Sequence, residues 1–276
     1  MPSSKEEEKK QVDYLYKVAE ETKPREVYFP CNIKEFDLSI DGGFRGGELV
    51  TVSGQTGMGK TLLCETFTKK FEKQGFPCLW FSYEMSPYYL NAKFLDIKVN
   101  TKEAEIFSPV DLSNATIDFL RERVKEAKDK YACKFIFIDH LHYLIPLKSV
   151  KSSSLFIGGI VRELKKMAVQ LNVIVFLIAH TKKIYQDEEL DLSSIRDTSL
   201  IAQESDYVFL IERIKKDEDK KQKKLEKKVV ETEWTNKSRV KLAKNRRTGK
   251  LKNVIFKYHQ KQLKPLEKYE ELFDED

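Results

Sequence analysis

From about residue 48 onward, short apolar runs alternate along the chain with segments in which apolar residues recur every three or four positions. The apolar runs predict strands at 48–53, 77–83, 134–139, 172–180 and 206–213. The periodic segments predict helices at 59–73, 115–131 and 155–171. Continuously apolar strands are buried on both faces, and strands separated by helices pack as a parallel sheet covered on both sides. The predicted fold class is therefore α/β, with a mainly parallel sheet and helices on both faces.

The same pattern divides the chain into an N-terminal arm, one α/β domain and an acidic C-terminal tail, at 1–29, 30–262 and 263–276. The arm contains a predicted amphipathic helix at 4–22. Two further strands, predicted at 238–245 and 253–259 and joined by the turn RRTGK, close the domain. No internal repeat is visible, so a single domain with two appendages is the most economical organisation.

Residues 54–61, GQTGMGKT, fit the pattern G-x-x-x-x-G-K-T between a predicted strand and a predicted helix. The glycines let successive backbone N–H groups turn toward phosphate oxygens, and the start of the following helix adds partial positive charge. Lys60 would reach the β- and γ-phosphates, and the Thr61 hydroxyl would bind magnesium. The segment predicts a phosphate-binding loop (P-loop) for ATP and Mg²⁺, made of Gly54, Gln55, Thr56, Gly57, Met58, Gly59, Lys60 and Thr61.

Three polar residues come at the ends of apolar strands, where ligands bind in open α/β sheets. Asp139 ends KFIFID and would hold Mg²⁺ together with Thr61. Glu84 follows CLWFSY and would orient and deprotonate an attacking water, or be an ordinary acidic residue in the first turn of a helix. His180 ends VIVFLIAH and would hydrogen-bond the γ-phosphate, or have a structural role. The pattern alone leaves both pairs of alternatives open.

The segment KNRRTGK at 244–250 carries Lys244 and Arg246 two positions apart on a predicted strand, so both side chains would point to one face. Such a pair suits a phosphate clamp that one subunit supplies to another. Without further context, ordinary basic residues beside a hairpin turn explain it at least as well.

In this order, the segments resemble the RecA-like motor domain of the DnaB superfamily of hexameric replicative helicases, in particular its phage helicase–primase and mitochondrial Twinkle branch. The resemblance covers roughly residues 30–260. Six segments carry it: IKEFDLSIDGGFRGGELVTVSGQTGMGKT (33–61), WFSYEMS (80–86), FIFIDHLHYL (135–144), FLIAH (176–180), SSIRDTSLIAQESDYVFLIER (193–213) and AKNRRTG (243–249). Six matches in order are far more specific than any one of them.

The resemblance implies a RecA-like P-loop NTPase that forms a hexameric ring and moves along single-stranded DNA. It assigns the water-activating base to Glu84 and phosphate sensing to His180, with Gln203 helping to pass the nucleotide state to the DNA loops. It also implies that Lys244 and Arg246 reach the ATP of a neighbouring subunit. The P-loop would then be catalytically complete only within a ring.

The resemblance also implies two DNA-gripping loops, at about 146–157 and 182–195. Phosphate contacts there would come from Lys148, Lys151, Lys182 and Lys183. The middle of the second loop is acidic, which weakens a purely electrostatic picture. A lysine-rich insertion near 215–237 has no counterpart in the family.

Composition limits the class of protein. Charged residues make up 34% of the 276, and the net charge is +6. No apolar run approaches the roughly 20 residues that span a bilayer, and the polar start MPSSKEEEKK is unlike a signal peptide. We therefore expect a cytoplasmic protein with no membrane partner. The family resemblance, and not the composition, implies a phage or phage-like origin. The four cysteines lie far apart without a C-x-x-C pair, which predicts buried, reduced thiols.

The function predicted from the sequence is that of an ATP-dependent, ring-forming DNA helicase of replication. Two alternatives stay open: a RecA- or RadA-like recombination or repair ATPase, and an accessory loader that uses ATP as an assembly switch. The tail LEKYEELFDED places Phe273 among acidic residues, and would dock on a polymerase or primase or be a solvated end.

Overall fold

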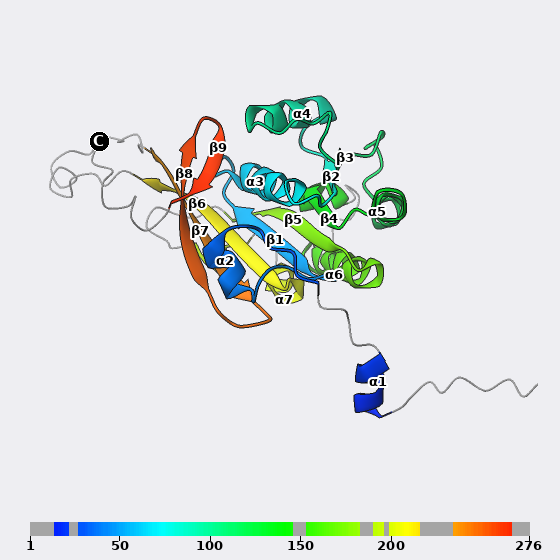
Figure 1. Cartoon of the computed structure of the whole chain (residues 1–276). Helices are drawn as coiled ribbons and strands as arrows, with labels where there is room; N and C mark the ends of the chain where they lie inside the picture. Colours follow the sequence, from blue (N-terminus) through cyan, green and yellow to red (C-terminus); the bar gives the residue numbers. More distant parts are fainter. Residues whose placement is uncertain are drawn as a thin grey trace, which may run out of the picture.

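The computed structural model describes residues 14–21, 27–145, 153–182, 190–195, 199–215 and 234–266. Within these residues, one nine-stranded sheet forms the centre and helices cover both of its faces (Figure 1). The strands are β1 Leu49–Gly54, β2 Cys78–Ser82, β3 Ile106–Phe107, β4 Phe135–Asp139, β5 Ile174–His180, β6 Tyr207–Lys215, β7 Trp234–Asn245, β8 Lys252–His259 and β9 Gln262–Pro265. The helices are α1 Leu15–Glu21, α2 Lys34–Ser39, α3 Lys60–Glu72, α4 Pro87–Asp96, α5 Ile117–Tyr131, α6 Ser153–Leu171 and α7 Ser199–Glu204, with 3₁₀ turns η1 Leu141–Leu144 and η2 Leu192–Ser194.

The strands lie in the order β3-β2-β4-β5-β1-β6-β7-β8-β9. The first six are parallel, and β7, β8 and β9 add an antiparallel extension. This confirms the predicted α/β class with a mainly parallel sheet. Each predicted strand and helix from residue 48 onward is present, with bounds within a few residues of those expected.

Two hydrophobic cores lie on opposite faces of the sheet. On one face, α3 packs Phe67 and Phe71 against the strands, and the Phe71 ring stacks on Phe135 with centroids 3.7 Å apart. On the other face, α5 and α6 bury residues such as Leu120 and Leu164. Because β1, β2 and β4 are buried at every position, their side chains can fill both cores at once. The four cysteines are buried and free, as expected.

Several short elements were not predicted: α2, α4, α7, β3 and β9. The start of α4 does carry a local signal, because Ser86 caps the helix and Pro87 occupies its first turn. The strand β9 runs to Pro265, three residues past the end of the predicted domain at 262, and the domain boundaries themselves stay a prediction. Of the helix predicted at 4–22, only residues 14–21 fall within the described part of the chain, and Leu15–Glu21 are helical.

The lysine-rich insertion joins two strands that pair with each other. Lys215 at the end of β6 is opposite Trp234 at the start of β7, so the insertion connects two strands that are paired where the described residues meet it. Residues 216–233 themselves lie outside the described part of the chain.

Candidate active site

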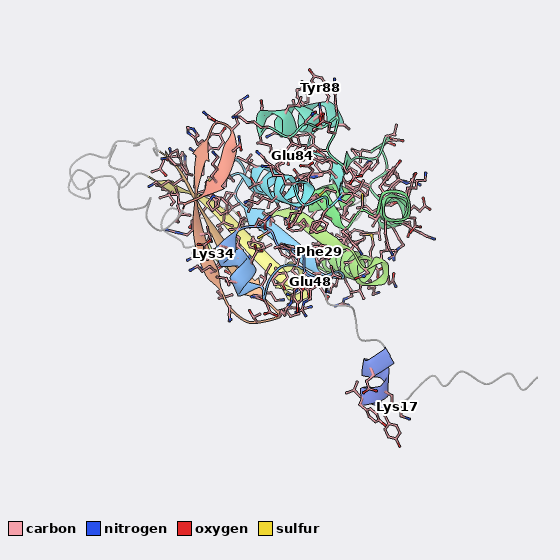
Figure 2. The ribbon with its side chains drawn as sticks, viewed as in Figure 1. Lys17, Phe29, Lys34, Glu48, Glu84 and Tyr88 are labelled. Atoms are coloured by element: carbon pink, nitrogen blue, oxygen red, sulfur yellow. The ribbon has the colours of Figure 1, made fainter. Side chains whose placement is uncertain are left out.

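Four neighbouring parallel strands end at one edge of the sheet and bring the predicted site residues together. Gly54 at the end of β1 pairs with His180 at the end of β5. Ser82 at the end of β2 pairs with Asp139 at the end of β4. Glu84 lies two residues beyond β2, close to α4 (Figure 2). The P-loop, Asp139, Glu84 and His180 therefore share the carboxyl edge of the sheet, as the sequence predicts.

The backbone of the P-loop needs glycine at several positions. Gly57 and Gly59 have φ values of 80° and 98°, in the left-handed region that glycine adopts without strain. At Gly54, a Cβ atom would lie only 2.4 Å from the carbonyl oxygen of Ile211 on β6. The loop leads directly into α3, whose first residue is Lys60. Unbonded backbone N–H groups at the start of such a helix favour a phosphate.

Lys60 is buried and its ammonium group donates a hydrogen bond to the Gln55 carbonyl oxygen at 3.0 Å. Burial lowers the pKa of Lys60, while the carboxylates of Asp139 and Glu84 act in the opposite direction. The side chain therefore folds back across the P-loop, and its ammonium group lies near the carboxylates of Asp139 and Glu84. It is placed to meet the charge of a bound nucleotide.

Thr61 and Asp139 form the predicted pair. The Thr61 hydroxyl donates a 2.8 Å hydrogen bond to Asp139 Oδ2. Burial raises the pKa of the fully buried Asp139 carboxyl to about 6, against the opposing effect of this hydrogen bond. Asp139 Oδ1 is also buried and has no hydrogen-bond partner among the described residues. An unpartnered carboxylate oxygen beside a hydroxyl group fits the oxygen ligands, direct or through water, that Mg²⁺ prefers.

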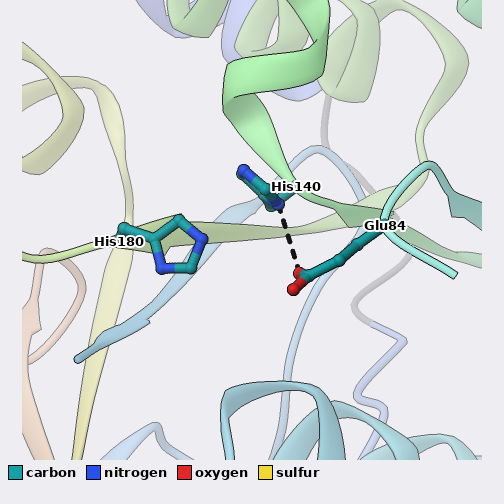
Figure 3. A group of neighbouring side chains, drawn as sticks. All are labelled: Glu84, His140 and His180. Atoms are coloured by element: carbon teal, nitrogen blue, oxygen red, sulfur yellow. Dashed lines mark ion pairs between the residues drawn. The ribbon is translucent and has the colours of Figure 1, made fainter. Parts of the chain in front are cut away.

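Glu84 has a neighbour that the sequence did not single out. His140 Nδ1 lies 3.3 Å from Glu84 Oε2, and the His180 ring meets the His140 ring edge-on with centroids 4.4 Å apart (Figure 3). Glu84 is 45% exposed, so water can reach it, whereas His140 is 12% exposed. The only available signal for His140 was its position directly after Asp139 in FIFIDHLHYL.

His180 is an uncharged imidazole at neutral pH. Burial is the largest of the effects that lower its pKa to about 4, and the charge of Lys60 acts in the same direction. A neutral ring can donate through one nitrogen and accept through the other. His180 is thus suited to a hydrogen bond with a phosphate oxygen or a water at this edge.

Lys244, Arg246 and Gln203 lie near the amino ends of the parallel strands. The P-loop lies at the opposite, carboxyl ends of these strands. Asn245 pairs with Tyr207 at the start of β6, and Tyr207 pairs with Val50 near the start of β1. The structure therefore does not bring Gln203 to the P-loop of its own chain. The prediction that both basic residues lie on a strand is wrong for Arg246, because β7 ends at Asn245.

The two basic side chains converge on the end of α7 all the same. Lys244 Nζ donates to the carbonyl oxygens of Ala202, Gln203 and Ser205, at 2.6, 2.9 and 2.7 Å. These bonds use all three donors of an ammonium group. Arg246 bonds Asp206 Oδ1 at 3.1 Å and the Gln203 carbonyl, and it remains 47% exposed. The guanidinium group has five N–H donors, so Arg246 keeps donors for another partner.

The predicted DNA-binding lysines are mostly outside the described residues. Lys148, Lys151 and Lys183 fall in such segments. Lys182 is exposed, and its backbone N–H donates to the Ser194 carbonyl at 2.8 Å. Together with the bridge between Thr181 and Ile195, this bond holds the two ends of the second predicted loop side by side. Among the described residues, no helix has both the length and the apolar character needed to cross a membrane.

Part of the chain is similar in sequence to known proteins. Residues 98–265, more than half of the chain, match the family model of the DnaB-like helicase C terminal domain. The chain is 27% identical over 215 residues to the replicative DNA helicase DnaB of Mycoplasma pneumoniae, covering 65% of this chain and 45% of that protein. It is 26% identical over 210 residues to a probable replicative DNA helicase of Trieres chinensis, covering 64% and 46%. The chain thus spans about half the length of the curated relatives that it matches.

Two solved structures share the fold. A DnaB-like replicative helicase, whose structure was described with its interactions with primase, superposes with a TM-score of 0.70 at 20% identity. That superposition covers 91% of this chain and 65% of the helicase. A second structure, that of an ATPase domain, superposes with a TM-score of 0.69 at 20% identity, covering 91% of this chain and 96% of that domain. At this level of identity the likeness concerns the fold.

Proposed function

Because the chain belongs to the DnaB-like helicase C-terminal domain family, we propose that it is an ATP-driven DNA helicase of replication. In this proposal, ATP binds with Mg²⁺ at the P-loop, and its hydrolysis moves a ring of subunits along single-stranded DNA. Family membership confirms the resemblance to the DnaB superfamily, while the assignment to a phage-like branch stays a prediction. The observation that carries the proposal is the meeting of Lys60, Thr61, Asp139 and Glu84 at one edge of the sheet.

In the proposed reaction, Glu84 accepts a proton from a water molecule, whose oxygen forms a bond to the γ-phosphorus. The bond from that phosphorus to the β,γ-bridging oxygen breaks, which yields ADP and phosphate. Lys60 neutralises charge on the β- and γ-phosphates. Thr61 and Asp139 would hold Mg²⁺, which supplies charge stabilisation when bound. His180 would hydrogen-bond the γ-phosphate and respond to its loss.

The ring in this proposal explains why the basic residues are remote from the P-loop. In a head-to-tail ring, one edge of each subunit faces the opposite edge of the next. Arg246 lies at the edge opposite the P-loop and is exposed, so it can reach a neighbour's nucleotide. Gln203 lies at the same edge, so its proposed role also belongs to the interface between subunits. The arm, of which α1 is the described part, would dock on the adjacent subunit.

Contacts with DNA and partner proteins belong to the same proposal. The second loop, closed by Lys182 and Ser194, would present lysines to the phosphates of the strand. The primase contact reported for a relative suggests a primase or polymerase as partner, with the acidic tail as the proposed docking segment. A protein that acts on replicating DNA works inside the cell, so a cytoplasmic location is part of the proposal.

The test compares wild type with Glu84→Gln in DNA-stimulated ATP hydrolysis and in unwinding of a forked duplex. We expect wild type to hydrolyse and unwind, and Glu84→Gln to bind nucleotide but hydrolyse it about 10²-fold or more slowly. The matched control is Glu103→Gln, which changes an exposed residue away from the loop. Strand exchange without unwinding would support a recombination ATPase instead. Turnover that does not depend on Glu84 would support an accessory loader.

A further inference from the structure

The geometry points to a second metal site, distinct from the Mg²⁺ site, in which Glu84, His140 and His180 together bind a transition-metal ion such as Zn²⁺. Each of the three residues offers one ligand atom, and these atoms all lie within 4.8 Å of one another. Figure 3 shows that they come from three separate elements: Glu84 follows β2, His140 follows β4 and His180 ends β5. The cluster is thus assembled by the sheet and not by one flexible loop.

The distances suit a small divalent ion. Two ligand atoms bound at about 2.0–2.1 Å to tetrahedral zinc lie about 3.3 Å apart. Glu84 Oε2 and His140 Nδ1 already have this separation, at 3.3 Å. The His180 nitrogen has to come at most about 1.5 Å closer, since the ligand atoms lie within 4.8 Å of one another and the target separation is about 3.3 Å. Rotation of the half-exposed Glu84 side chain and a small turn of the His180 ring supply that movement.

Two of these residues carry buried nitrogens that lack a hydrogen bond. His140 Nδ1 and His180 Nδ1 are buried and without a hydrogen-bond partner among the described residues. Although His140 Nδ1 is close to Glu84, the pair does not have hydrogen-bond geometry. Buried polar atoms almost always have a partner, and an exception calls for an explanation such as an ion. A metal bound between the two rings and the carboxylate would satisfy both nitrogens.

The ligand set selects the kind of metal. Two imidazoles and one carboxylate suit zinc, cobalt or nickel, whereas Mg²⁺ prefers oxygen ligands alone. Mg²⁺ would therefore remain with Thr61 and Asp139, and the new site would take a softer ion. His142 also lies nearby, with ring centroids 5.4 Å from His140 and 5.8 Å from His180. Three of the four histidines of the chain gather here.

The consequence for hydrolysis rests on the proposed function. A bound ion would use the Glu84 carboxylate and the His180 nitrogen, and so withdraw the proposed base and sensor from the reaction. The P-loop would still hold the nucleotide through Lys60 and the start of α3. Bound zinc would therefore inhibit ATP hydrolysis and leave nucleotide binding intact.

The direct test measures metal binding without nucleotide or hydrolysis. The full chain is titrated with Co²⁺ in the presence of excess Mg²⁺, and the visible absorption of the cobalt reports its ligands. We expect one saturable site in wild type, with affinity at least about 10-fold lower in His140→Ala and in His180→Gln. The matched control is His259→Ala, because His259 is the remaining histidine, is exposed and lies at the end of β8. We expect that variant to bind Co²⁺ like wild type.

Three results would overturn the site: no saturable absorption in wild type, unchanged binding in His180→Gln, or equal loss in His259→Ala. Circular dichroism and binding of a fluorescent ATP analogue verify that each variant is folded. In a second measurement, Zn²⁺ should inhibit wild-type hydrolysis, and a chelator should restore it at constant free Mg²⁺. Unaltered hydrolysis at zinc concentrations that fill the site would contradict the proposed inhibition by zinc. A wild type that binds Co²⁺ but never hydrolyses ATP would instead contradict the proposed helicase function.

Discussion

Thr61 and Asp139 are joined by a 2.8 Å hydrogen bond that links the start of α3 to the end of β4. This bond aims the Thr61 hydroxyl and one carboxylate oxygen at the same point beside the P-loop. It depends on the register of β4 against its neighbours, because Asp139 is opposite Ser82 and one position beyond Ile138. A hydroxyl group held in this way would be an oxygen ligand for Mg²⁺ in the proposed site.

We therefore predict that Thr61→Ala weakens Mg²⁺-dependent nucleotide binding more than Mg²⁺-independent binding. The Mg²⁺ concentration for half-maximal binding of an ATP analogue should rise about 10-fold or more, since one ligand and its orienting hydrogen bond are lost. Thr61→Ser keeps the hydroxyl and should stay close to wild type. Equal Mg²⁺ dependence in Thr61→Ala and Thr61→Ser would show that this hydroxyl does not serve the ion.

Short sequence patterns were sufficient to predict which residues lie around the P-loop. The apolar run that ends at Asp139 and the glycines before Lys60 are signals contained in a few consecutive residues. Strands that are apolar throughout must be central and parallel, which places their carboxyl ends at one edge. That reasoning located Glu84 and His180 beside the loop without any knowledge of their contacts.

What the sequence could not provide depends on contacts between distant segments. His140 meets Glu84 and His180 only because β2, β4 and β5 end side by side, and HLHYL carries no local sign of that meeting. Arg246 reaches Gln203 because β7 pairs with β6 through a register shift near Val208, which no periodicity reveals. The helix α7 has six residues, too few for a helical period to be recognised.

Asp206 is the centre of a buried network and gives a second prediction. It accepts hydrogen bonds from the Leu49 backbone N–H at 2.8 Å, from Lys165 at 2.5 Å and from Arg246 at 3.1 Å. Asp206→Ala should lower the free energy of unfolding by about 3 kcal/mol, because it leaves a half-buried charge and a buried N–H unpaired. Urea-induced unfolding measures the loss.

Glu204→Ala is the matched control for this prediction. Glu204 pairs with Arg162 at 2.9 Å, but Arg162 is 60% exposed, and such surface pairs contribute at most about 1 kcal/mol. If the two variants lose similar stability, the hydrogen bonds of Asp206 to Leu49 on β1 and Lys165 on α6 add no more stability than a surface ion pair.

Glu65 on α3 gives a prediction for pH dependence. Its side chain is 1% exposed, and the ammonium group of Lys93 is 4.0 Å from Glu65 Oε1. Burial raises its pKa from 4.5 to about 7. A pKa raised on folding means that the folded state holds the proton more tightly, so stability falls as pH rises from 4.5 through 7. The loss should approach about 3 kcal/mol above pH 8, at 1.36 kcal/mol per unit.

Glu65→Gln should therefore be more stable than wild type at pH 8 and about equal to it at pH 4.5, as measured by unfolding in urea at each pH. Glu72→Gln, on the same helix, is the control, and its difference from wild type should stay constant across this range. A constant difference for Glu65→Gln as well would mean that its carboxyl group does not titrate in the way burial predicts.

Lys244 and Arg246 should behave differently although they belong to one segment. Lys244 uses its three donors on the carbonyl oxygens at the end of α7, where a cation is also favoured by the helix dipole. Lys244→Ala should therefore lower the free energy of unfolding by roughly 1–3 kcal/mol, the cost of leaving such carbonyl groups unsatisfied.

Arg246→Ala should change the free energy of unfolding by at most about 1 kcal/mol, since its ion pair is half exposed. Its main effect should be on hydrolysis, by about 10³-fold or more, with nucleotide binding retained.

Mixing subunits tests whether Arg246 acts on a neighbour. Arg246→Ala and Lys60→Ala subunits should each be inactive alone, but in an equal mixture about one interface in four would combine an intact P-loop with an intact Arg246. Hydrolysis should then recover in the mixture, in proportion to that fraction. Arg123→Ala is the control for the loss of a partly exposed arginine, because Arg123 pairs with Glu126 on α5 and not with a residue of the proposed site. No recovery in the mixture, with rings still forming, would mean that Arg246 does not complete the P-loop of the next subunit.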